Sequence, residues 1–377
     1  MECELGKKTP TKNNPFMMVN FSGEHSEITS NGSLTTAENN YDEFPRRRLG
    51  MAEHDELRDR LRNCPNLPSS PAVANRLIQL MESTSPDVEE IVQVLSRDSA
   101  LTAKILQLAN SSFFPYKCQV TTLPKAAILI GFNGILATAL SFTLVRHFRN
   151  EGSTGLDLDL FWRRSLLVAS ACRAIGDICG QKKPEELFLA GLIQDIGMLA
   201  LDRLNPDLYH SEGLNQTLHA EVVAYEQEKL GVTHALVGSW LLTDWNFPSK
   251  ICMAVQLSDE PQLFPDSDGP EKFYNCVGFA TTLVGLIITN ASDETFLAQV
   301  DLAESSLGID PFAFAQILRK LKDIVQESEK LFEMNSHSDA NLFQLTEQAR
   351  TVLSRRHVPL ANQLDALFLQ NAIPGPG

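Results

Sequence analysis

Apolar side chains recur at helical spacing along most of this chain, from about Leu57 onward. Residues 88–95, for example, place valine, isoleucine, valine and leucine at positions i, i+3, i+4 and i+7. The preceding segment Ser85–Asp87 is typical of a helix start, because serine can cap a helix and proline suits its first turn. Convincing alternation of apolar and polar residues, the mark of strands, is missing. The pattern predicts an all-α fold.

Caps and helix breakers divide the rest of the chain into further predicted helices. Asp98 can cap the helix that carries the apolar residues of 101–108, and Pro184, Gly231 and Pro248 supply later boundaries. The predicted segments from there on are 123–130, 134–148, 161–179, 184–202, 215–230, 234–244, 249–257, 271–289, 311–334 and 338–355.

One uncharged stretch, Ala126–Val145, is long enough to cross a bilayer. Gly131, Asn133 and Gly134 lie inside it, and a break at these residues into two buried helices accounts for it equally well. We expect the second arrangement and no membrane insertion.

Composition narrows the class of protein. The formal net charge of −15 disfavours a surface that neutralises phosphates, so we expect no nucleic-acid binding. The seven cysteines are scattered and never spaced as CxxC, which suits reduced thiols in a cytoplasmic protein. Residues 1–56 have little apolar periodicity, so we predict a disordered leader, within which Arg46–Arg48 form a basic cluster.

The segment GLIQDIGMLAL, Gly191–Leu201, resembles the GLLHDIGKL segment of the HD phosphohydrolases. In that superfamily the adjacent histidine and aspartate bind metal together. Here Gln194 stands in the histidine position and Met198 replaces the lysine that often follows. The carboxylate of Asp195 is the strong ligand that remains.

Longer segments resemble the HDOD family, whose members are degenerate relatives of the HD hydrolases. The matching segments, in chain order, are VLSRDSALTAKILQLANSSFF (94–114), TTLPKAAILIGFNGI (121–135), FWRRS (161–165), AGLIQDIG (190–197) and GVTHALVGSWLLTDWNFP (231–248). Ser99 stands where the family usually has proline. The resemblance covers about Leu61–Phe332 and implies an HDOD-type helical bundle.

This resemblance divides the chain into three parts. We expect an HDOD domain over 57–335, made of an N-terminal helical subdomain (57–150), a degenerate HD-like bundle (155–260) and closing helices (261–335). Residues 336–377 are then a helical tail and disordered end. The tail helix could serve interaction or simply cap the core, and we expect the domain to fold without it.

The resemblance also places the former metal positions. They fall on Arg164, Gln194, Asp195 and His234, and a histidine expected after the turn Trp245–Pro248 is replaced in a helix that contains Gln256. Arginine cannot bind a cation, because it stays protonated and offers no acceptor. Two strong ligands, Asp195 and His234, are fewer than a catalytic zinc site uses. We therefore predict no bound metal, no cofactor and no catalysis.

The function that the resemblance implies is that of a bacterial signalling scaffold. Its expected partners are signalling proteins, with cyclic-dinucleotide and two-component pathways as candidates. Two alternatives stay open. One is a residual metal-dependent phosphohydrolase that borrows Glu221, Glu226 or Asp244 as a ligand, and the other is a sensor that holds a nucleotide without cleaving it.

A carboxylate left without its metal is costly to bury. We therefore predict an ion pair between Arg164 and Asp195 where the metal would lie, with Arg163 as the fallback partner. The alternative is that Arg164 points into solvent and that Asp195 accepts hydrogen bonds from backbone amides or from His234.

Overall fold

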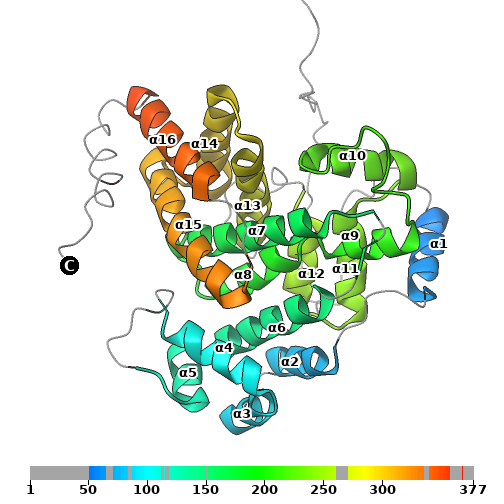
Figure 1. The fold of residues 1–377 in the computed structure, drawn as a ribbon, viewed down its shortest axis with the longest axis vertical. Coiled ribbons are helices and arrows are strands. Elements are labelled where there is room, and N and C mark those ends of the chain that lie inside the picture. Colours follow the sequence, from blue (N-terminus) through cyan, green and yellow to red (C-terminus); the bar gives the residue numbers. More distant parts are fainter. Residues whose placement is uncertain are drawn as a thin grey trace, which may run out of the picture. The chain divides into compact units, whose positions relative to one another are not determined.

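The fold is helical throughout the part that can be described. A computed structural model describes residues 51–64, 71–83, 87–111, 114, 119–149, 152–153, 155–259, 271–334, 339–356 and 367. These residues form sixteen α-helices and no strand (Figure 1). The predicted all-α class is confirmed. Residues 48–377 belong to one compact unit, and the division at 150 and 260 stays a prediction.

The first six helices are α1 (Met51–Arg62), α2 (Ala72–Glu82), α3 (Val88–Ser96), α4 (Ser99–Ala109), α5 (Leu123–Ile130) and α6 (Phe132–Phe148). Helix α1 begins at Met51, so residues 51–56 of the predicted leader are helical and not disordered, while the rest of the leader lies outside the described residues. Asp87 caps α3 by accepting from the Glu89 amide, and Asp98 caps α4 as predicted. Ser85 and the Arg46–Arg48 cluster lie outside the described residues.

The uncharged stretch is broken at Gly131. This glycine has a φ of 85° and separates α5 from α6, which meet at an angle of 112°. A side chain would strain that backbone, so the predicted break has a local cause. Among the described helices, α13 (Glu271–Thr289) is long and apolar enough to cross a membrane, but 67% of its apolar window is buried in the protein.

The next six helices are α7 (Leu158–Ile178), α8 (Pro184–Ile193), α9 (Ile196–Leu204), α10 (His219–Leu230), α11 (His234–Asp244) and α12 (Ser249–Gln256). The single helix predicted over 184–202 is wrong. The chain turns at Gln194 and Asp195, and α9 starts afresh after Asp195. Apolar residues continue on both sides of this turn, so the hydrophobic pattern of the sequence does not reveal the break between the two helices.

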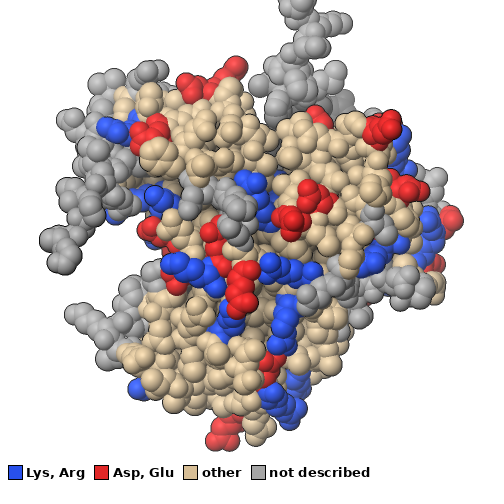
Figure 2. Space-filling model, viewed as in Figure 1, with Lys and Arg blue, Asp and Glu red and all other residues tan. Residues whose placement is uncertain are grey.

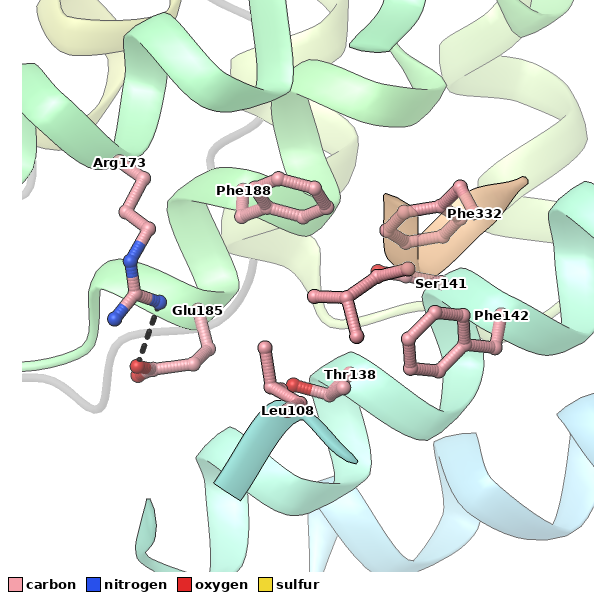
Figure 3. A pocket seen from close by; sticks show the side chains of 9 residues that line it. Leu108, Thr138, Ser141, Phe142, Arg173, Glu185, Phe188 and Phe332 are labelled. Atoms are coloured by element: carbon pink, nitrogen blue, oxygen red, sulfur yellow. Dashed lines mark hydrogen bonds and ion pairs between the residues drawn. The ribbon is translucent and has the colours of Figure 1, made fainter. Parts of the chain in front are cut away.

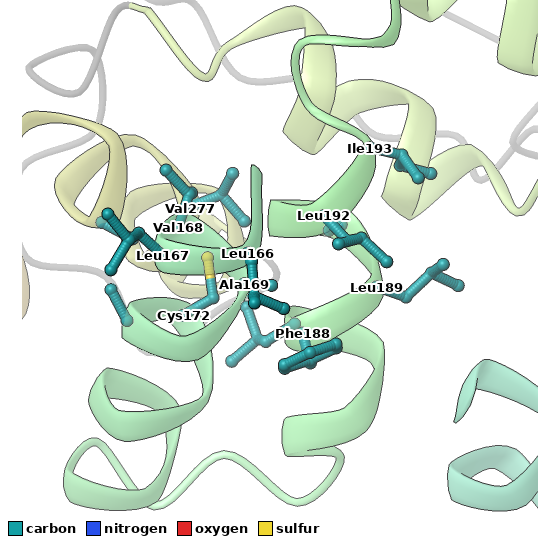
Figure 4. Close-up of a cluster of buried hydrophobic side chains, with 14 of the residues drawn as sticks. Leu166, Leu167, Val168, Ala169, Cys172, Phe188, Leu189, Leu192, Ile193 and Val277 are labelled. Carbon is teal, nitrogen blue, oxygen red and sulfur yellow. The ribbon is translucent and has the colours of Figure 1, made fainter. Parts of the chain in front are cut away.

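Helices α7 and α8 form the centre of the core (Figure 4). Leu166 and Ala169 on α7 lie near Leu192 and Phe188 on α8, while Val168 lies beside Val277 of α13, and all are buried. The close approach depends on Gly191, since a Cβ there would lie 2.7 Å from the Cys172 sulfur and 3.0 Å from the Ala169 Cα. Helices α13 and α15 pack against the other side of α7.

The last helices are α13, α14 (Asp293–Leu307), α15 (Pro311–Phe332) and α16 (Asp339–Arg356). Helix α14 was not predicted, although Ser292 caps it and Phe296, Val300 and Leu307 are buried on one face. Helix α16 packs on α13, α14 and α15. Its buried residues belong to the main core cluster: Leu342, Leu345, Ala349, Val352 and Leu353.

Because of this packing, α16 caps the core, and we now expect the domain to need this helix in order to fold. Ending the chain at residue 338 should abolish the cooperative unfolding transition. Each large apolar side chain that loses its burial costs about 1.5–3 kcal/mol, against a total stability of about 5–15 kcal/mol. A chain that ends at Leu367 is the control and should melt like the full protein. An equally cooperative melt of both chains, followed by circular dichroism, would contradict this assignment.

Candidate functional site

The turn between α8 and α9 places Gln194 and Asp195 inside the protein, where both residues are completely buried. Asp195 therefore needs partners, because an isolated carboxylate in an apolar interior is very unfavourable. Three elements supply them. Helix α7 brings Arg164, α11 brings His234, and the start of α10 brings His219.

Arg164 binds Asp195. Its Nε lies 3.1 Å from Oδ2 of the carboxylate, and both side chains are buried. The predicted ion pair is confirmed, with Arg164 and not Arg163 as the partner. The contact runs through one nitrogen, so the two-pronged grip that a guanidinium can offer is not used.

His234 contacts the other carboxylate oxygen of Asp195. Its Nε2 lies 3.2 Å from Oδ1, and on the opposite side of the ring Nδ1 lies 2.8 Å from Oε2 of Glu226. The backbone amide of His234 also donates to this Glu226 oxygen, and the Tyr209 hydroxyl donates to the other one. Glu226 therefore fixes the orientation of the ring through its Nδ1.

Burial alone would lower the pKa of His234. The carboxylates of Glu226, Asp259 and Asp195 outweigh burial and raise this pKa well above its ordinary value. Burial likewise opposes ionisation of Asp195, but the positive charges of His219, His234 and Arg164 bring its pKa far below the ordinary range. The favoured state is thus a charged carboxylate beside a protonated His234.

Two residues of this cluster, His219 and Asp259, were not predicted. His219 Nε2 lies 2.8 Å from Asp259 Oδ1 and 3.9 Å from Asp195 Oδ1, and Asp259 Oδ2 lies 3.4 Å from His234 Nε2. The two imidazole rings meet edge to face at 4.9 Å. Asp259 follows α12, where a ligand was expected after the Trp245–Pro248 turn. The residue proposed for that place, Gln256, lies half-buried three positions earlier, and among the described contacts of the cluster it makes none.

The other predicted positions lie apart from the cluster's centre. The Gln194 amide oxygen accepts a hydrogen bond from the Thr281 hydroxyl on α13. Glu221 is exposed on α10, and Asp244 pairs with Arg58 and Arg62 of α1. Of the three residues that a residual hydrolase could borrow, only Glu226 reaches the cluster, and both of its oxygens already accept hydrogen bonds.

The site nevertheless offers more ligand atoms than the two that were predicted. One atom each from Asp195, His219 and His234 lie within 4.8 Å of one another, close enough to share one ion. Within the described part of the chain, Asp195 Oδ1, His234 Nε2 and Asp259 Oδ2 are buried without a well-aligned hydrogen bond. Three ligands meet the minimum for a catalytic zinc site. However, a cation would have to displace the proton of His234 and share Asp195 with Arg164.

The HDOD domain family model matches residues 67–261. An uncharacterised protein of Treponema pallidum is 22% identical over 232 residues, which cover 60% of this chain and 43% of that protein. The chain thus spans less than half the length of this curated relative.

Two solved structures are similar over most of the chain. A Shewanella amazonensis protein, whose description suggests a metal-dependent phosphohydrolase, gives a TM-score of 0.56 at 20% identity and covers 74% of this chain and 100% of its own. An HDOD domain protein of unknown function from Geobacter sulfurreducens gives 0.54 at 18% identity, covering 84% and 99%. At such identities these structures support the fold alone.

Proposed function

Because the chain belongs to the HDOD domain family, we propose that it is a non-catalytic regulatory protein of signal transduction that acts by binding other proteins. The observation that carries this proposal is the buried contact between Arg164 and Asp195. A guanidinium is permanently charged and has no lone pair to offer a metal. It neutralises the carboxylate at the point where a hydrolase would place its cation.

The second positive charge of the site supports the same function. His234 lies between Asp195 and Glu226, so each of its ring nitrogens is turned toward a carboxylate, and these negative charges favour the protonated ring. A metal ligand must instead be a neutral imidazole. In this state the cluster stabilises the junction of α8, α9 and α11, and the domain can present its outer surface to partners.

Metal-dependent hydrolysis is the second candidate, favoured by the convergence of Asp195, His219 and His234 within 4.8 Å. These three residues would hold a single ion, and the ion would supply Lewis-acid chemistry. Its binding would compete with the proton on His234, so the metal affinity of such a site would increase with pH.

Metal content and turnover distinguish the two candidates. We expect the purified full-length protein to hold no stoichiometric metal, measured by elemental analysis. We also expect no hydrolysis of cyclic nucleotides, nucleoside phosphates or a model phosphodiester with added manganese, iron or magnesium. Turnover that is lost in Asp195→Asn but kept in Asp244→Asn, a matched change at a surface ion pair, would overturn the proposal in favour of the hydrolase.

The partners follow from the proposed regulatory role. We expect signalling proteins in the cytoplasm, with cyclic-dinucleotide and two-component pathways as the first to test. Affinity capture from the source organism, followed by mass spectrometry, addresses them. A panel of nucleotides in a thermal-shift assay tests the sensor alternative, since a ligand that binds only the native state raises the melting temperature.

A further inference from the structure

A cavity of about 280 Å³ lies away from the Asp195 cluster, between helices α4 and α6 on one side and the end of α15 on the other. Its apolar lining comes from all three helices: Leu101, Phe142, Val145, Leu331 and Phe332. A volume of this order suits part of a small organic ligand. Cavities between packed substructures are also common places for ligands to bind.

A smaller void of about 20 Å³ adjoins this cavity (Figure 3), and Phe142, Leu331 and Phe332 line both. It has room for about one water molecule. Phe188 points into it, while the buried pair Arg173–Glu185, 3.0 Å apart, closes its far end. The two spaces together give the cavity a deep, mainly apolar floor.

The rim of the larger cavity is positively charged. Lys104, Arg146 and Arg149 line it together with the carboxylate of Glu333, and Nη2 of Arg146 also pairs with Asp98 at 2.6 Å. Charged side chains gather along the boundary between helices α2 to α6 and helix α15 (Figure 2). In a protein with a formal net charge of −15, three cationic groups against the carboxylates of Glu333 and Asp98 leave this rim locally positive, which favours an anion.

The carboxylate of Glu333 lies at this rim, in the position that a bound anion would take. Its side chain is 76% exposed, yet its carboxylate lies 2.6 Å from the Lys104 ammonium. Arg149 lies close by as well, since its Nη1 donates to the backbone carbonyl of Glu333 at 3.0 Å. An exposed glutamate can move away at little cost, since surface ion pairs contribute only about 0–1 kcal/mol.

From this geometry we infer that the cavity binds a small organic phosphate with an apolar body. The phosphate would replace the Glu333 carboxylate on Lys104 and approach Arg146, and the apolar part would lie over Phe142 and Phe332. Phosphate suits this rim better than carboxylate, because a dianion can bind Lys104 and still reach the guanidinium of Arg146, whose Nη2 already pairs with Asp98. The inference does not depend on whether the Asp195 cluster is catalytic.

Calorimetric titration of the full-length protein with octyl phosphate tests the inference. Octanol, which lacks the charge, and butyl phosphate, which has a shorter chain, should each bind at least about tenfold more weakly. Lys104→Gln should weaken octyl phosphate binding about tenfold or more, as expected for the loss of a charge-assisted hydrogen bond. Glu333→Gln should strengthen it severalfold, because the competing carboxylate is gone.

Lys320→Gln is the matched control, since Lys320 also pairs with a carboxylate, that of Asp177, at 3.4 Å but does not line the cavity. It should leave the affinity unchanged, and all three variants should melt cooperatively. If Lys104→Gln and Glu333→Gln bind octyl phosphate as the unaltered protein does, the site is not here. Binding to phosphatidylglycerol vesicles without binding of octyl phosphate would also overturn the inference, by indicating a membrane surface as the ligand.

Discussion

Replacing Arg164 with alanine is expected to lower the free energy of unfolding by about 3–5 kcal/mol. The change removes the cation whose Nε lies 3.1 Å from Asp195 and leaves that carboxylate buried with one partner fewer. Most of the loss is the cost of the uncompensated charge. Urea unfolding followed by circular dichroism measures it.

A double-mutant cycle separates this cost from lost packing. Asp195→Asn removes the charge that Arg164 neutralises, so the double variant should recover much of the loss, with a coupling energy of about 1–3 kcal/mol. Arg163→Ala, a change of the same type at the next residue, is the control and should alter stability by about 1 kcal/mol or less. Additive effects of the two changes would show that the pair contributes nothing specific.

The second large effect is expected at Gly197, on α9 two residues after Asp195. A Cβ here would collide with the backbone carbonyl of His234 and would lie 2.6 Å from the Gly238 amide nitrogen. Both obstacles belong to the backbone of α11, so they cannot rotate away. Gly197→Ala should therefore push α9 from α11 and destabilise the protein by about 4 kcal/mol or more, a cost reached by few single changes.

Gly285→Ala provides the comparison. Gly285 lies within α13, and a Cβ there meets no atom within 4 Å. Alanine should stabilise this helix by about 0.5–1 kcal/mol, because glycine loses more backbone freedom on folding. Melting temperatures of the two variants should thus shift in opposite directions. A similar small shift in both would show that α9 and α11 are not held in contact.

The parts of the fold that could be predicted are those specified locally. The helix that follows Asp98 has a cap whose side chain binds the first turn, and Gly131 marks a break that its backbone requires. The Arg164–Asp195 pair could be predicted because the family resemblance aligned both positions and electrostatics required a partner for the carboxylate.

The rest of the site depends on tertiary contacts. His219 and Asp259 are 40 positions apart in the chain, and no spacing rule connects a helix start to a loop. Only the tertiary arrangement that puts the start of α10 and the residue after the α12 turn beside Asp195 brings them together. The one clue was chemical, since His219 is a histidine at a predicted helix near a degenerate metal motif. The turn at Gln194 was hidden by apolar residues on both sides.

The contact between Gly197 and Gly238 fixes the positions of the helices that carry the site independently of the side chains that form it. It is made by backbone atoms, so the spacing between α9 and α11 does not depend on which side chains fill the space between Asp195 and His234. Side chains of the site can therefore be exchanged, metal ligands for an ion pair or the reverse, without moving the helices that carry them. A fold with such a frame can lose one chemistry while it keeps its shape, and its outer surfaces stay available for a different task.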